Sequence, residues 1–219
     1  MSRQWQVLIF YGLSGVLILS IISSMLGGLF PLMSDELKIV ILNYVLVLSV
    51  IVFGVYRFKE VLVDSLKKVS FDKHFFNQVL SGVIGLLVWS LVFGFLRLMV
   101  GGGIDDSVNQ EAATSLIMSY PLLMSFLSVC LAPFQEELIF RLAMMNLFGN
   151  SKYQKLAGWL ISSLVFGLLH VIGSGEWIHL IGYSVSGLIL GWFYLKTDNI
   201  WYSIAIHLVN NLIATLLVF

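Results

Sequence analysis

The sequence predicts an all-α protein, a polytopic membrane bundle of seven to eight transmembrane helices with a polar-cored C-terminal half. Hydrophobic residues make up 59% of the 219 residues and charged residues only 11%, and the mean hydropathy is +0.97. Soluble domains carry about 25% charged residues, so 12 basic and 12 acidic side chains cannot cover a water-facing surface. The apolar residues form continuous rather than alternating runs, which favours helices over a membrane β-barrel.

Seven apolar runs are long enough to cross a bilayer, because a spanning helix takes about 20 mostly apolar residues. They cover residues 6–28, 38–56, 77–100, 121–148, 156–173, 178–195 and 199–219. Pro133 lies inside the fourth run, and an interior proline kinks or breaks a helix. A break at this proline would give eight segments instead of seven.

The segments between the runs alternate in charge. Segments 57–77 and 149–155 are rich in lysine and arginine, whereas segments 29–37 and 101–114 carry acidic residues and no basic ones. The positive-inside rule therefore predicts a cytoplasmic N-terminus and an external C-terminus. Apolar residues recur at helical spacing within 57–77, which predicts an amphipathic helix on the inner leaflet; a solvated cytoplasmic loop is the alternative.

Several function classes lack their expected signals. The formal net charge is zero, so no basic excess indicates a nucleic-acid partner. The single Cys130 cannot form a disulfide within the chain. The sequence has no Gly-x-Ser-x-Gly elbow and no phosphate-binding glycine loop, so serine catalysis and nucleotide use are not indicated. The expected partner is the lipid bilayer, and nothing in the sequence specifies an oligomeric state.

Ionisable and strongly polar residues inside the predicted spans concentrate in the C-terminal part. Such residues cost about 2.5–3.5 kcal/mol at the bilayer centre on insertion scales, which makes them functional candidates. They are Glu136, Glu137 and Arg141 in the fourth run, His170 in the fifth, and His207 and Asn211 in the seventh. The chain is therefore expected to divide into accessory helices over 1–114 and a catalytic bundle over 115–219.

The spacing of these residues suggests hydrolysis. Glu137 and Arg141 are four residues apart, so they can pair on one helix face. Glu136 points about 100° away and is left for another partner, which suits a general base. The alternative is a structural ion-pair network that fixes helix register.

The remaining polar residues extend this hypothesis. His207 and Asn211 are also four apart and present two hydrogen-bond donors on one face, as an oxyanion site requires. We expect His170 to share a water molecule with Glu136, which predicts amide hydrolysis by an activated water. Two histidines and a glutamate can also bind zinc, but no His-Glu-x-x-His run is present. We therefore predict that the protein uses no cofactor; zinc is possible but disfavoured.

Three motifs resemble those of the CPBP family, the CAAX-protease and bacteriocin-processing proteins, also called Abi proteins. They are Glu136-Glu137-x-x-x-Arg141, Phe166-x-x-x-His170 and His207-x-x-x-Asn211, in this order on three predicted spans. The resemblance covers about residues 115–219. It implies an all-helical fold with a conical cavity open toward the cytosol.

The resemblance also implies roles for the motif residues. Glu136 would activate the water with help from His170, and His207 and Asn211 would form the oxyanion hole. Glu137 and Arg141 would support that arrangement, without a metal.

The predicted function is that of an intramembrane endopeptidase acting on a peptide or protein at the membrane. The resemblance places it in bacteriocin immunity, peptide maturation or CAAX-type processing, in a multi-pass protein of a bacterial cell membrane. A non-catalytic immunity or scaffold protein is the alternative. A transporter with a Glu/His proton relay is less favoured, because only one half of the chain is polar.

Overall fold

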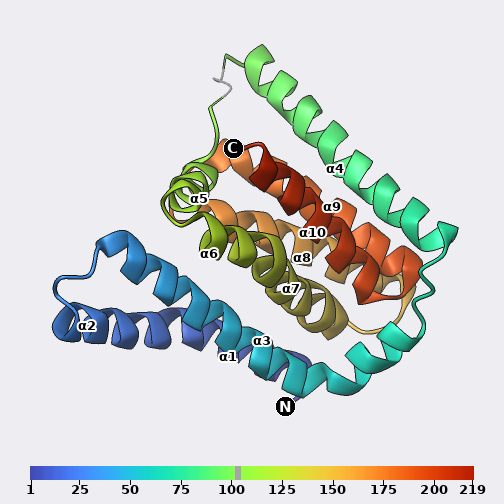
Figure 1. Cartoon of the computed structure of the whole chain (residues 1–219). Helices are drawn as coiled ribbons and strands as arrows, with labels where there is room; N and C mark the ends of the chain where they lie inside the picture. The colour runs from blue at the N-terminus through green and yellow to red at the C-terminus, as the bar shows by residue number, and fades with distance from the viewer. Residues whose placement is uncertain (102–104) are drawn as a thin grey trace.

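A computed structural model describes residues 1–101 and 105–219 of the chain, and it confirms the all-α class (Figure 1). All regular elements of these residues are helical. They are α1 (Arg3–Leu13), the π-helix η1 (Ser14–Ile18), α2 (Leu19–Leu29), α3 (Asp35–Lys67), α4 (Lys73–Met99), α5 (Val108–Ser119), α6 (Pro121–Phe126), the π-helix η2 (Leu127–Leu131), α7 (Ala132–Glu137), the π-helix η3 (Leu138–Met144), the 3₁₀ turn η4 (Met145–Leu147), α8 (Lys152–Val171), α9 (Trp177–Thr197) and α10 (Ile200–Leu216).

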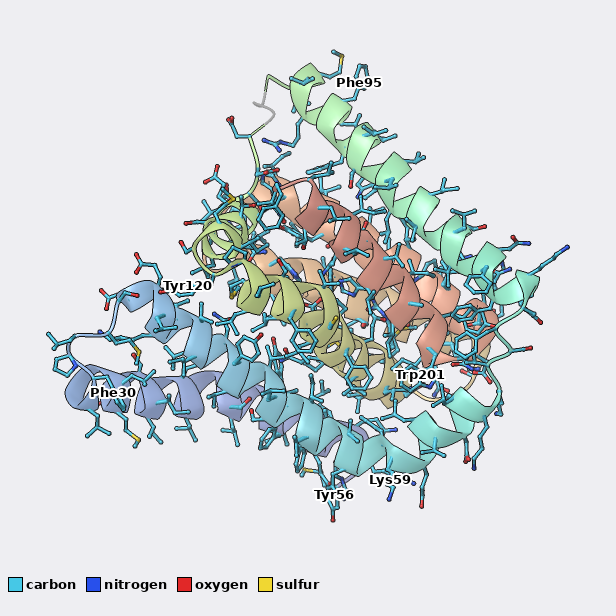
Figure 2. All side chains as sticks on the ribbon, in the orientation of Figure 1. Phe30, Tyr56, Lys59, Phe95, Tyr120 and Trp201 are labelled. Carbon is cyan, nitrogen blue, oxygen red and sulfur yellow. The ribbon has the colours of Figure 1, made fainter. Side chains whose placement is uncertain are left out.

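Six helical stretches of the described residues are long and apolar enough to cross a membrane. They are Arg3–Leu29, Asp35–Lys67, Lys73–Met99, Pro121–Leu147, Lys152–Val171 and Trp177–Thr197. The seventh predicted span corresponds to α10, which is apolar but shorter. Many large apolar side chains point outward from these helices, among them Tyr56 and Phe95 (Figure 2). The chain is thus an integral membrane protein with a polytopic helical fold.

Pro133 does not divide the fourth span. Helical structure continues from Pro121 to Leu147, so the eight-segment alternative is wrong. The π-helix η2 ends at Leu131, two residues before the proline, and the backbone N–H of Ala132 donates to the carbonyl of Leu127, five residues back. A π-turn can accommodate an interior irregularity without ending the helix.

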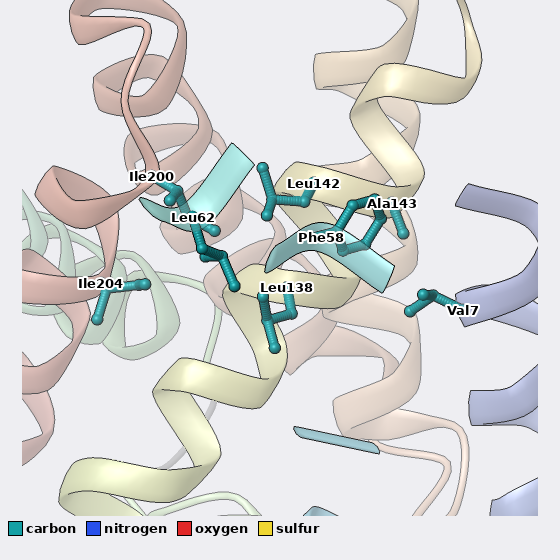
Figure 3. Packing of buried hydrophobic residues seen from close by; sticks show 8 residues of the cluster. All are labelled: Val7, Phe58, Leu62, Leu138, Leu142, Ala143, Ile200 and Ile204. Atoms are coloured by element: carbon teal, nitrogen blue, oxygen red, sulfur yellow. The ribbon is translucent and has the colours of Figure 1, made fainter. Parts of the chain in front are cut away.

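The expected amphipathic helix over 57–77 is not a separate element. Helix α3 runs without interruption to Lys67, and its last turns bury Phe58 and Leu62 but leave Val61 and Leu66 exposed. Phe58 and Leu62 are buried in a cluster with Leu138 and Ile200 (Figure 3). Part of the apolar spacing in this segment therefore reflects a contact with the protein core, and the placement of its exposed face on the inner leaflet stays a prediction.

Part of the segment 101–114, which lies between two of the predicted spans, belongs to helix α5. The hydroxyl of Ser107 accepts a hydrogen bond from the backbone N–H of Gln110 at 3.2 Å, a standard N-cap. The carboxylate of Glu176 accepts from the backbone N–H of Val108 at 2.8 Å. These two acceptors hold the start of α5 beside the connection between α8 and α9.

Helices α6 to α10 form the centre of the bundle, and α4 lies along α9 and α10 (Figure 1). Helices α8 and α9 approach closely because small residues meet between them. A Cβ at Gly187 would lie 3.1 Å from the Cα of Ser163, and such close approach is typical of small residues in membrane helices. On the other side, α1 and α3 pack against η3, so the N-terminal helices share a core with the C-terminal ones.

Candidate active site

The two adjacent glutamates lie at the end of α7, where the chain enters the π-helix η3. Arg141 Nε donates to Glu137 Oε2 at 2.9 Å, and both side chains are 0% exposed. The predicted Glu137–Arg141 pair is confirmed. The guanidinium also lies over the ring of Phe166, 5.9 Å from its centroid, which is a cation–π distance. The pair is a fully buried support beneath the site.

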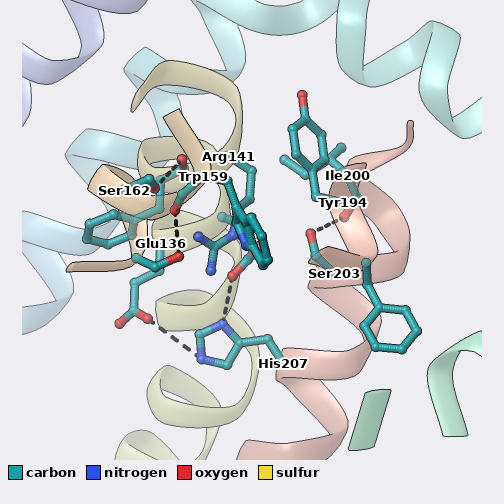
Figure 4. A network of polar contacts seen from close by, with 12 residues as sticks. Glu136, Arg141, Trp159, Ser162, Tyr194, Ile200, Ser203 and His207 are labelled. Carbon is teal, nitrogen blue, oxygen red and sulfur yellow. Dashed lines mark hydrogen bonds and ion pairs between the residues drawn. The ribbon is translucent and has the colours of Figure 1, made fainter. Parts of the chain in front are cut away.

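His207 of α10 lies between the two glutamates (Figure 4). Its Nδ1 is 3.0 Å from Glu137 Oε1, and its Nε2 is 3.6 Å from Glu136 Oε2. A carboxylate can only accept, so Nδ1 carries a proton toward Glu137. Both oxygens of Glu137 are therefore engaged, one by Arg141 and one by His207. Glu136 is left with its carboxylate partly exposed.

His170 lies in the last turn of α8 and is held in a defined orientation. Its Nδ1 is 2.8 Å from the carbonyl of Phe166, and since a carbonyl only accepts, this nitrogen donates. The ring stacks on Tyr183 at a centroid distance of 4.5 Å. In the neutral imidazole, Nε2 then carries the lone pair and can accept a hydrogen bond from water.

Glu136 and His170 line the same cavity, which has a volume of about 280 Å³. Its wall mixes apolar and polar side chains from five parts of the fold, which is the usual character of a small-molecule or peptide site. The lining residues are Tyr11, Asn43, Leu46, Val47, Asn109, Leu127, Ala132, Gln135, Glu136, Phe140, Leu169 and His170.

Asn211 lies one turn beyond His207 on α10. Its Nδ2 donates to the carbonyl of Ser128 at 3.0 Å, within the π-helix η2, and it retains a second N–H. The structure therefore brings five of the six predicted residues into one connected group: Glu137, Arg141 and His207 in direct contact, with Glu136 beside His207 and His170 in the same cavity. Asn211 borders this group through η2 and does not line the cavity.

Sequence reasoning missed several residues of the cavity. The wall includes Tyr11, Asn43 and Asn109, which come from helices treated as accessory. Asn43 carried a usable signal, since it is a strongly polar residue inside an apolar run. Tyr183 was also missed, although its ring holds His170 and its hydroxyl lies 2.7 Å from Ser107 Oγ.

Metal binding by the described residues has little geometric support. Across 1–101 and 105–219, no three His, Cys, Asp or Glu side chains are grouped as metal ligands would be. The absence of a cofactor stays a prediction, which chelation tests.

Comparison with known proteins agrees with the three motifs. Residues 118–213 match the family model of type II CAAX prenyl endopeptidase Rce1-like proteins. This segment contains all six predicted site residues, and the match confirms the resemblance to the CAAX-protease family. It supports a membrane endopeptidase in general terms. No curated protein and no solved structure gives a significant match.

Proposed function

We propose that this chain is a peptidase of the type II CAAX prenyl endopeptidase (Rce1-like) family, whose model matches residues 118–213, and that it cleaves peptide bonds with a water molecule activated by Glu136. The observation that carries this proposal is the division of labour between the two glutamates. Glu137 is fully buried and bound on both oxygens, whereas Glu136 lines the cavity. This difference supports Glu136, rather than Glu137, as the base.

In the proposed reaction, Glu136 and His170 hold the attacking water between them. The carboxylate of Glu136 takes one proton, and Nε2 of His170 accepts the hydrogen bond from the other. The resulting hydroxide attacks the carbonyl carbon of the substrate and forms a tetrahedral intermediate. Glu136 then passes its proton to the departing amine as the C–N bond breaks, so the base is regenerated.

The negative oxygen of that intermediate needs donors that are already in place. We assign this role to His207 Nε2 and to the second amide N–H of Asn211. Nε2 can donate only if the ring carries both protons, because Nδ1 already donates to Glu137. The two negative glutamates would then be balanced by positive Arg141 and His207, which suits a buried cluster.

The biological setting follows the resemblance. The substrate would be a peptide or a membrane-associated protein, in bacteriocin immunity, peptide maturation or CAAX-type processing. The protein would reside in a bacterial cell membrane with a cytoplasmic N-terminus. The charge distribution of its loops supports that orientation.

The proposal is tested with purified protein in liposomes and a library of internally quenched peptides in ¹⁸O-labelled water. We expect cleavage that places one ¹⁸O in the new carboxyl group, as direct attack by water requires. His170→Ala should abolish cleavage. His74→Ala, which changes an exposed histidine outside the site, should leave it intact. Equal cleavage by the two variants would refute the role of His170, and no cleavage by the wild-type protein would favour the scaffold alternative.

A further inference from the structure

The cavity extends from Glu136 toward one end of the bundle only. On the fourth span its other lining residues, Leu127, Ala132 and Gln135, precede Glu136, apart from the buried Phe140. The wall is completed by the last turn of α8 and by Asn109 at the start of α5. Among the lining residues, Leu169 and Asn109 are the exposed ones. The mouth thus lies beside α5.

The opposite end of the site is sealed. Directly beyond Glu137, residues 138–143 are all buried, and Leu138 and Leu142 pack against Phe58 and Leu62 of α3 (Figure 3). The indole N–H of Trp201 also donates to the carbonyl of Leu62 at 3.1 Å. A dry, packed core of this kind leaves no path for water or a peptide from that end.

The two ends differ strongly in charge. The sealed end carries most of the basic residues, namely Arg3, Arg57, Lys59, Lys67, Lys68, Lys73, Lys152, Lys155 and Lys196. The end beside α5 has only Lys38 and Arg97. Lys38 is paired with Asp35 at 3.0 Å, and Arg97 donates to the carbonyl of Asp105 at 2.7 Å. By the positive-inside rule, the sealed end is cytoplasmic and the mouth faces the other side of the membrane.

We infer that the catalytic cavity opens to the extracytoplasmic side of the membrane. Given the proposed function, on which this part rests, the substrate is a peptide segment presented on that side: an exported peptide, or an external tail or loop of a membrane protein. It is not the C-terminus of a cytosolic protein. This differs from the cytosol-facing cavity that the family resemblance implies.

Cysteine accessibility tests the direction of the cavity without requiring activity. In a Cys130→Ser background, single cysteines are placed in the cavity (Glu136→Cys), at its mouth (Asn109→Cys) and in the basic loop (Ser70→Cys). Intact cells are treated with a membrane-impermeant cationic methanethiosulfonate, which reaches only the external face of the membrane that holds the protein. Remaining thiols are then counted by gel shift after denaturation.

We expect Glu136→Cys and Asn109→Cys to react in intact cells, and Ser70→Cys to react only after permeabilisation, with at least a tenfold difference in rate. If Glu136→Cys fails to fold, Gln135→Cys replaces it as the cavity probe. Reaction of the cavity cysteine only after permeabilisation, or protection from both sides, would overturn the inference.

A second measurement tests the substrate side. A membrane-impermeant quenched peptide is added outside sealed proteoliposomes in which the labelled fraction of Asp106→Cys, an exposed position outside the cavity wall, reports orientation. Cleavage should scale with the fraction of molecules that expose position 106, and scaling with exposure of position 70 would contradict the inference. If the cavity cysteine is labelled from outside but the protein cleaves no peptide in detergent, the proposed function is contradicted while the direction of the cavity is supported.

Discussion

Helix α2 and the π-helix η3 have opposite surroundings, although both lie in membrane spans. No residue of α2 is buried, whereas every residue from Glu137 to Ala143 is buried, including the charged Glu137 and Arg141. In a soluble protein the polar segment would face outward. Here the lipid accepts apolar side chains, so the polar groups are the ones that must find protein partners. Within the membrane spans, charged residues therefore identify the side of a helix that packs inside the protein.

The N-terminal helices nevertheless contribute to the site. Tyr11 and Asn43 form part of the cavity wall, and Val7 and Phe58 pack on the buried segment of η3. The division of the chain at residues 114 and 115 remains a prediction, and in the structure the two parts meet in one core. Variants of the buried C-terminal site, each compared with a matched exposed control, sharpen this contrast.

The largest expected effect on stability is that of Arg141→Ala. It leaves Glu137 buried without its main partner, which costs about 3–5 kcal/mol. Arg3→Ala is the matched control in the N-terminal region, because Arg3 and Glu60 form an ion pair with side chains 48% and 80% exposed, worth at most about 1 kcal/mol. Thermal unfolding in one detergent compares the two variants, and equal melting temperatures would show that the Glu137–Arg141 pair is not buried in solution.

The next largest effect is expected at the close contact of α8 and α9. Gly187→Val forces a side chain against the backbone of Ser163 and should cost about 1–3 kcal/mol, as overpacking does. Gly27→Val places the same side chain on α2, where a Cβ meets nothing within 4 Å. The test is the melting temperature of each variant, and a loss at Gly27 as large as at Gly187 would be inconsistent with the structure.

A smaller effect is expected at Tyr183. Tyr183→Phe removes the hydroxyl that contacts Ser107, which is worth about 1 kcal/mol, while keeping the ring that stacks on His170. We expect turnover to fall several-fold with little change in KM, because the ring of His170 is held less firmly. Tyr153→Phe, at a position 82% exposed, is the control and should match the wild-type protein in both constants.

No effect is expected from metal removal. If Glu136 activates the water, cleavage should survive exhaustive treatment with a strong chelator. Loss of activity that returns on addition of Zn²⁺, with one zinc per chain by elemental analysis, would instead indicate that a metal generates the nucleophile.

The sequence predicted those features that depend on local geometry. The Glu137–Arg141 pair follows from spacing on one helix, and the apolar runs follow from the thickness of the bilayer. The position of His207 between both glutamates depends on the register between α7 and α10, which no local pattern specifies. The same holds for the meeting of Glu136 and His170 in one cavity.

Helix α5 was not predicted, for a physical reason. It is short and polar, so it lacks the apolar signal of a span, and its first backbone N–H donates to the distant Glu176. At the end of α3, a stripe of apolar residues has the same spacing whether it faces lipid or Leu138, so the sequence could not show that Phe58 and Leu62 lie in the protein core.

The turnover of Glu136→Gln most directly tests the central claim that this glutamate is the base that activates the water. The variant keeps the size of the side chain but removes the base, so peptide cleavage should fall by about 10²–10⁴-fold, the usual contribution of general base catalysis. Glu36→Gln, at an exposed position on α3, should cleave at the wild-type rate. Wild-type turnover by folded Glu136→Gln protein would contradict the account.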